Sequence, residues 1–130
     1  MRVLRRLCLW VLLALLLGSL GACSRVPRGN WHVETGRAPI LELPEGRQPR
    51  IAAVAEAQQD ARLKLLRFVQ SMTHADSTFV GDYMARNPAV NARIQSLILS
   101  APQFEARYPD GRVEVDMGVN VDEVRRLLAQ

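Results

Sequence analysis

The sequence predicts a single α+β domain that follows a cleaved N-terminal segment. Residues 51–72 carry apolar side chains at helical spacing, whereas residues 103–119 alternate apolar and polar side chains around a Pro-Asp-Gly turn. Residues 1–22 have the layout of a signal peptide. The expected order is strand-helix-(helix)-strand-strand-helix, with the helices packed on one face of an antiparallel hairpin.

The N-terminal segment has the three parts of a bacterial export signal. Three arginines precede an unbroken apolar run over residues 7–17, and small residues lead up to Cys23. The stretch Leu20-Gly21-Ala22-Cys23 resembles the lipoprotein cleavage box, in which the signal peptide is removed and the cysteine is acylated. A retained transmembrane helix would need roughly 20 apolar residues, and a plain secreted protein has no use for a cysteine here. The sequence therefore predicts a lipoprotein with its acyl chains on Cys23.

The residue after the cysteine indicates which of the two membranes the lipid anchor is expected to enter. Ser24 stands where well-studied envelopes use aspartate to retain lipoproteins at the inner membrane. The resemblance therefore implies an outer-membrane protein whose domain faces the periplasm or the cell surface. Acyl burial contributes about 0.8 kcal/mol per methylene, and two or more chains hold a protein stably. The membrane is thus the first expected partner.

The overall charge is largely a property of the signal peptide. The chain has 17 Lys and Arg against 13 Asp and Glu, and removal of three signal arginines leaves 14 against 13. No basic cluster with interleaved aromatic residues is present, which argues against nucleic acid as a partner. Of the two cysteines, Cys8 leaves with the signal and Cys23 is modified, so no disulfide is expected. The mature domain must therefore be held by an ordinary core.

Residues 23–37 carry proline and glycine without an apolar period, which predicts a flexible tether ahead of a domain over residues 38–130. Trp31 and His32 interrupt this tether, and they either dock on lipid headgroups or a partner, or fold back onto the domain. Residues 40–43 are expected to form a short strand between Pro39 and Pro44. Because proline cannot donate to a ladder, this strand belongs at a sheet edge.

Residues 51–72 are expected to form the main helix. Its core-facing stripe is expected to comprise Ile51, Val54, Ala55, Ala61, Leu65, Val69 and Met72. Gln58 and Arg62 interrupt this stripe one turn apart. They suggest a subunit interface, or alternatively Arg62 extends its charged end to the rim of the packed face.

Shorter helices are expected next. Phe79, Val80, Tyr83 and Met84 suit a short helix, and Asn87-Pro88 suits an N-cap followed by proline in the first turn of another. Near the C-terminus, Asn120 precedes a last helix in a pattern that resembles a capping box.

The hairpin at residues 103–119 has a predicted register. Phe104, Ala106 and Tyr108 are expected to face inward with Val113, Val115 and Met117, which pairs Ala106 with Val113 and Phe104 with Val115. A three-residue loop with a glycine bulge would instead set Ala106 against Glu114. Burial of the valines favours the first register.

A family resemblance is carried by residues spread over about 50–121. They are Ala53-x-Ala55-x-Ala57-x-x-Asp60-Ala61-Arg62-x-x-Leu65, Thr78-x-x-x-Asp82, Ala101, and Tyr108-x-Asp110-Gly111-x-Val113-x-Val115. This set resembles the bacterial outer-membrane lipoprotein family named for a 20-kilodalton membrane-associated antigen, which includes the flagellar assembly lipoprotein FlgP. The resemblance implies a strand-helix-strand-strand module, an outer-membrane anchor and self-association without catalysis. The short first strand and the Asn87-Pro88 restart depart from the family pattern.

The chemistry-bearing residues do not predict an enzyme. His32 and His74 are the only histidines, and neither has a second histidine or a cysteine at ligand spacing. We therefore expect no catalytic residue, no metal, no cofactor and no small-molecule substrate. The sequence predicts a lipid-anchored envelope protein that self-associates as a homo-oligomer or scaffold, with a flagellar-motor ring as one form. The alternative is a lipid-anchored binding module for cell wall or for another envelope protein.

Overall fold

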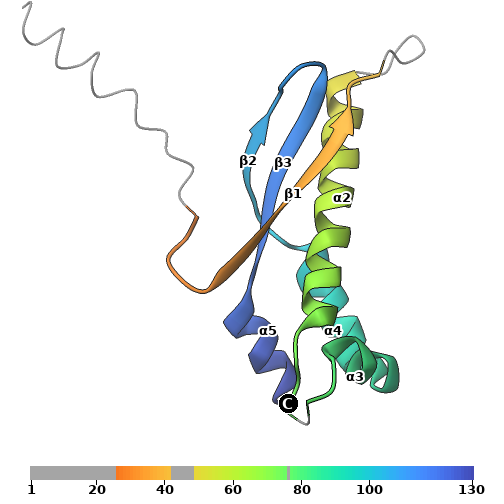
Figure 1. Cartoon of the computed structure of the whole chain (residues 1–130), viewed down its shortest axis with the longest axis vertical. Coiled ribbons are helices and arrows are strands. Elements are labelled where there is room, and N and C mark those ends of the chain that lie inside the picture. The colour runs from red at the N-terminus through yellow and green to blue at the C-terminus, as the bar shows by residue number, and fades with distance from the viewer. Residues whose placement is uncertain (1–25, 42–48, 76) are drawn as a thin grey trace, which may run out of the picture.

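The computed structural model describes residues 26–41, 49–75 and 77–130, and these form the α+β domain that the sequence predicts (Figure 1). The leader and the cleavage box with Cys23 lie outside the described residues. The elements in chain order are β1 (Trp31–Pro39), α2 (Pro49–Ser71), α3 (Val80–Arg86), α4 (Pro88–Leu99), β2 (Gln103–Arg107), β3 (Arg112–Asn120) and α5 (Val121–Leu128).

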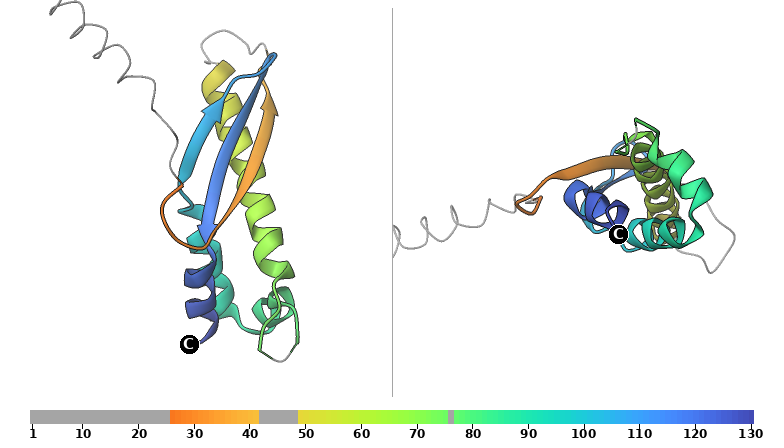
Figure 2. Two further views of the ribbon diagram at one scale, coloured as in Figure 1. Left: turned by 60° about the vertical axis from the view of Figure 1, so that its left-hand side comes forward. Right: turned by 90° about the horizontal axis from the view of Figure 1, so that it is seen from below.

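The three strands form one antiparallel sheet in the order β1-β3-β2, with β3 at its centre. Helix α2 lies along one face of this sheet, and α3, α4 and α5 gather at the end where α2 finishes (Figure 2). Side chains that β3 buries against α2 are those of Val113, Val115, Met117 and Val119. Among the described elements, no helix covers the opposite face, which we call the open face.

The expected tether and the expected first strand are both corrected by β1. The strand runs over residues 31–39, so residues 31–37 belong to the sheet and the tether ends before Trp31. Ile40 and Leu41 follow the strand, and residues 42 and 43 lie outside the described part. The inward positions near the end of β1 are Gly36 and Ala38, which are too small to give an apolar alternation. Pairing with β3 forms this strand, and Pro39 ends it at the sheet edge, as expected of proline.

Helix α2 confirms the predicted long helix but not the whole predicted stripe. Its buried residues follow a four-residue spacing: Ala53, Ala57, Ala61, Leu65 and Val69. Ile51, expected in the core, is 64% exposed, and Ala55 is exposed too. The alanines matter because Gly36 of β1 lies directly against the helix backbone. A Cβ at Gly36 would stand 1.8 Å from the carbonyl oxygen of Ala57 and 2.6 Å from the nitrogen of Ala61.

The hairpin keeps the predicted face for β3 but has a different register. Ala106 pairs with Val115 and not with Val113, which is a slip of two residues that preserves the inward face. Val115 is fully buried, as expected. A bulge between Gln103 and Glu105 turns Phe104 onto the open face, so its predicted inward position is wrong.

The connection is also longer than the predicted two residues, which places Tyr108 outside the core. It spans residues 108–111, and the amide of Arg112 donates to the carbonyl of Pro109 at 3.0 Å. Tyr108 is half exposed in this connection, contrary to the expectation that it faces inward.

The predicted helix starts are confirmed. Asn87 caps α4 by accepting a hydrogen bond from the amide of Val90, and Pro88 is in the first turn. Asn120 caps α5 by accepting from the amides of Asp122 and Glu123 at 3.0 and 3.3 Å.

Candidate functional site on the open face of the sheet

The open face is divided along the strands into a charged half and an apolar half. Alternation places Trp31, Val33, Thr35 and Arg37 of β1 on this face. On β3 the same face carries Arg112, Glu114, Asp116 and Gly118. The charged half lies toward the hairpin connection, and the apolar half lies toward the start of β1. Both halves are therefore presented by one sheet.

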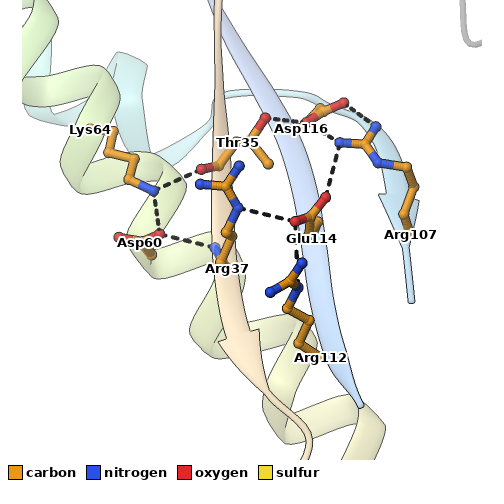
Figure 3. A network of polar contacts seen from close by, with 8 residues as sticks. All are labelled: Thr35, Arg37, Asp60, Lys64, Arg107, Arg112, Glu114 and Asp116. Carbon is orange, nitrogen blue, oxygen red and sulfur yellow. Dashed lines mark hydrogen bonds and ion pairs between the residues drawn. The ribbon is translucent and has the colours of Figure 1, made fainter. Parts of the chain in front are cut away.

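Two carboxylates of β3 stand at the centre of the charged half (Figure 3). Arg107 donates to both oxygens of Asp116, at 2.6 and 3.1 Å, and the Thr35 hydroxyl donates to the same carboxylate at 2.6 Å. Arg37 Nε donates to Glu114 at 3.1 Å, while guanidinium nitrogens of Arg107 and Arg112 lie 3.7 Å from that carboxylate. Forked arginine–carboxylate contacts of this kind fix geometry as well as charge.

The carboxylates lie beneath the arginines. The side chains of Glu114 and Asp116 are 16% and 18% exposed, whereas those of Arg37 and Arg112 are 59% and 54% exposed. A partner that approaches the charged half therefore meets guanidinium groups first. Glu105, which bonds Arg107 at 2.9 Å, supplies an exposed negative charge at the β2 side.

These contacts shift the pKa values of Asp116 and Arg107. Hydrogen bonds from Arg107 and then from Thr35 outweigh burial and lower the pKa of Asp116 below its ordinary value of 3.8. The hydrogen bond to Asp116 raises the pKa of Arg107. The pair of Asp116 and Arg107 is thus ionised at neutral pH.

Asp116→Asn tests the contribution of this network to stability. Because the native pKa is depressed below the ordinary value of 3.8, the stabilisation is complete above about pH 5 and is lost progressively as the pH falls through the native pKa. We expect the variant to lose about 2 kcal/mol at neutral pH and to show a shallower loss of stability below pH 4. Urea unfolding at several pH values measures both effects, with Glu56→Gln on the exposed side of α2 as the control. An unchanged acid slope in Asp116→Asn would contradict the assignment.

A second pair of charges closes part of the β1 edge. Lys64 Nζ donates to the carbonyl of Thr35 at 2.8 Å, and Asp60 accepts from the amide of Arg37 at 2.9 Å (Figure 3). The two side chains also bond each other at 2.7 Å. Burial tends to raise the pKa of Asp60, but hydrogen bonds from Lys64 and the Arg37 amide outweigh it and lower the pKa. A further strand at this edge would need to bond the carbonyl of Thr35 and the amide of Arg37. Because Lys64 and Asp60 already occupy these two groups, they block strand addition here.

The apolar half is built on an aromatic pair. The rings of Trp31 and Phe104 meet edge to face with centroids 5.4 Å apart. Phe104 lies over Gly118, where a Cβ would stand 2.4 Å from the ring. Val33 beside them is 37% exposed. Trp31 therefore folds back onto the domain, which was one of the two expectations for it.

The predicted interface residues Gln58 and Arg62 are placed differently from each other. Gln58 donates to the side chain of Gln103 at 2.8 Å, within the same chain. Arg62 is half-buried, and its Nε finds no hydrogen-bond partner among the described residues. A neighbouring subunit at these two residues stays a prediction.

The remaining polar candidates have structural contacts. His32 stacks on Phe68 with centroids 3.4 Å apart, and His74 stacks on Tyr83 at 4.4 Å. The described residues contain no cluster of three His, Cys, Asp or Glu that could hold a metal ion. Within the same residues, none of the helices combines the length and apolar composition needed to cross a membrane.

The chain matches no protein-family model, no curated protein and no solved structure.

The sequence prediction missed the open face. Its residues were assigned to a tether, to the polar side of a hairpin or, for Phe104, to the inward side. The signal that could have revealed it was the alternation of charged residues at Arg112, Glu114 and Asp116. That pattern indicates a solvated face in one strand, and only the pairing with β1 and β2 shows that it forms a network.

Proposed function

We propose that this chain is a non-catalytic, lipid-anchored envelope protein that self-associates at the outer membrane. The observation that carries the proposal is Leu20-Gly21-Ala22-Cys23 at the end of an export signal. A domain held on a membrane by acyl chains is concentrated in two dimensions, which favours association through modest surfaces. The open face supplies such a surface.

The family resemblance supports the same function. It implies a strand-helix-strand-strand module, and the described domain has that order with α3 and α4 inserted between α2 and β2. The first strand has nine residues, so the expected short first strand no longer separates this chain from the family pattern. The narrower form of the proposal is a ring or assembly lipoprotein of the flagellar motor. Adjacent basal-body genes would support that form, and their absence would count against it.

The lipid anchor is tested by Cys23→Ser. We expect the variant to remain an unprocessed precursor that takes up no fatty acid, because the acylated sulfur is gone. Metabolic labelling with a fatty-acid analogue measures this. In density fractionation we expect the wild-type protein to travel with outer-membrane markers. Ser24→Ala is the matched control and should be labelled normally. Equal label on Cys23→Ser, or wild-type protein in the inner-membrane fraction, would contradict the proposal.

A cleft beside the sheet favours the alternative function, a binding module for cell wall or another envelope protein. It is lined by Trp31, Pro102, Asn120 and Glu123, among others. The indole N–H of Trp31 is buried and has no hydrogen-bond partner among the described residues. A pull-down with purified cell wall separates the two functions: retention that Trp31→Phe abolishes would favour the binding module over self-association.

A further inference from the structure

We propose that two copies of this chain associate edge to edge, with β2 of one copy pairing antiparallel with β2 of the other around Ala106. The two three-stranded sheets then form one continuous sheet, and a two-fold axis passes between the two Ala106 residues perpendicular to it. This inference rests on the lipid anchoring and self-association proposed above and identifies their interface.

The two edges of the sheet differ in how they are protected. The β1 edge is blocked by the ion pair from α2 described above. The β2 edge is the other border of the sheet, next to the charged half of the open face (Figure 1). An edge strand whose backbone groups are unpaired is a template for a strand of another chain. The β2 edge is therefore the place to look for a partner.

The hydrogen-bond pattern of the sheet shows which groups of β2 are free. Because Thr35 directs its carbonyl away from β3, its partner Asp116 directs its own backbone groups toward β2. Asp116 pairs with Glu105, so Ala106 in the next position turns its N–H and C=O to the free edge. Among the described residues, neither group of Ala106 has a hydrogen-bond partner. Two Ala106 residues placed opposite each other would exchange two hydrogen bonds.

The side chains beside Ala106 select a second copy and one register. With Ala106 opposite Ala106 of the second copy, Glu105 of each copy lies opposite Arg107 of the other. A slip of two residues in one direction sets Glu105 against Glu105, and a slip in the other direction sets Arg107 against Arg107. Opposite charges across a strand pair are stabilising, and like charges are destabilising. The edge is thus complementary to itself only in the register centred on Ala106.

Both members of this charge pair are accessible to a second copy. The side chains of Glu105 and Arg107 are 42% and 39% exposed, and they bond each other at 2.9 Å within one chain. In the dimer each Glu105 lies between Arg107 of its own chain and Arg107 of the other. Arg107 keeps its forked contact with Asp116, which fixes the position of the guanidinium group.

The helices leave room for this pairing. Rotation about an axis perpendicular to the sheet keeps both α2 helices on the same face. Helix α2 lies over the β1 side of the sheet, where Gly36 meets its backbone, and it contacts the start of β2 through the side chain of Gln58. With strands about 4.8 Å apart, the two helix axes are roughly 20 Å apart. Packed helices are about 8–10 Å apart, so the two helices do not collide.

The same rotation gives a place to the predicted interface residues on α2. A cleft where α2 begins is lined by Arg50, Ile51, Val54 and Tyr108. In the antiparallel pair this cleft lies toward the start of β2 in the second copy, where Gln58 bonds Gln103. Arg62 follows Gln58 by one turn, and its Nε has no hydrogen-bond partner among the described residues. The Tyr108 hydroxyl of the second copy supplies an acceptor on that side.

The lipid anchors are compatible with this arrangement. When the two-fold axis lies along the membrane normal, the two copies stand at one height above the bilayer. The eight residues from Cys23 to Asn30 span at most about 28 Å when fully extended. Because the paired edge is short, the contact should form between acylated copies on one membrane, where the effective concentration is high.

Ala106→Pro tests the edge. Proline removes the N–H that would donate to the second copy, whereas the pairing of β2 with β3 does not use that group. Acylated full-length protein, labelled with donor or acceptor dyes, is reconstituted in vesicles of phosphatidylethanolamine and phosphatidylglycerol, and energy transfer reports association. We expect Ala106→Pro to weaken association at least about tenfold. Ala106→Val keeps the N–H, and as the matched control it should associate like the wild type.

Glu105→Arg tests the charge pair. It sets like charges opposite each other at both positions, so we expect association at least about fivefold weaker on the same vesicles. Glu56→Arg makes the same change of charge on the exposed side of α2 and should associate like the wild type. Thermal melts show which variants are folded, and Glu105→Arg decides the question if Ala106→Pro does not fold.

The outcomes separate the two proposals. Wild-type protein that shows no energy transfer on the vesicles would overturn the proposed self-association, and this interface with it. Wild-type protein that associates while folded Ala106→Pro or Glu105→Arg associates equally would overturn this interface alone.

Cysteine cross-linking tests the register. Acylation of Cys23 and loss of Cys8 leave an introduced cysteine as the single free thiol. Ala106→Cys on the vesicles, oxidised with copper phenanthroline, should form a disulfide-linked dimer, because Cα atoms directly opposite each other are about 5.5 Å apart. In Glu105→Cys the two cysteines would be about 8 Å apart, too far for a disulfide. Faster dimer formation by Glu105→Cys than by Ala106→Cys would show a slipped register and overturn the proposed pairing.

Discussion

Gly36→Ala should destabilise the domain by about 3 kcal/mol or more, a large share of the total stability of a domain this size. The new Cβ would stand 1.8 Å from the Ala57 carbonyl oxygen and 2.6 Å from the Ala61 nitrogen. Both atoms belong to the backbone of α2, so no rotamer change relieves the clash. Helix α2 must move away from β1, which also loosens the hydrogen bonds of Asp60 and Lys64 to that strand. Urea unfolding followed by circular dichroism measures the loss.

Gly118→Ala provides the control for this prediction. Its Cβ would also meet an obstacle, at 2.4 Å, but that obstacle is the ring edge of Phe104 on the open face. A side chain at the surface can rotate away, so we expect this variant to cost about 1 kcal/mol. If the two substitutions lowered the free energy of unfolding by the same amount, the contact of Gly36 with the backbone of α2 would not explain the loss in Gly36→Ala.

The parts of the fold that the sequence predicted are those with a local cause. The helical period sets α2, side-chain caps at Asn87 and Asn120 start α4 and α5, and the alternation of valines sets the inward face of β3. Each of these signals lies within one element. They were therefore visible without knowledge of the neighbours.

The first strand lacked such a signal. Its inward positions include Glu34, Gly36 and Ala38, which do not alternate as apolar residues do. Gly36 was assigned to a tether because glycine favours flexible segments, yet its lack of a side chain is what lets the sheet reach α2. Only the long-range pairing with β3 distinguishes these two uses of glycine.

The hairpin register failed for a related reason. The prediction rested on keeping the valines of residues 113–119 on the inward face. A slip of two residues keeps them on that face equally well, so this criterion could not choose between the two registers. The observed register is the one that places Arg107 opposite Glu114 and in reach of Asp116, while the bulge carries Phe104 onto Gly118. The open face thus contributes to the choice of register. The candidate site could not be predicted because it depends on that same register.

Val115→Asp should prevent folding. Val115 lies at the centre of the central strand, between Gly36 of β1 and Ala106 of β2, and its side chain is fully buried against the core. Replacement loses about 2 kcal/mol of apolar burial and leaves an unpaired carboxylate in the core, at about 3–5 kcal/mol. Together these costs come to about 5–7 kcal/mol, which equals the whole stability of a domain at the lower end of the usual range of about 5–15 kcal/mol. Circular dichroism should show an unfolded chain, whereas Val26→Asp, at an exposed valine before β1, should fold like the wild type. A folded Val115→Asp protein would show that β3 does not turn this side chain toward α2.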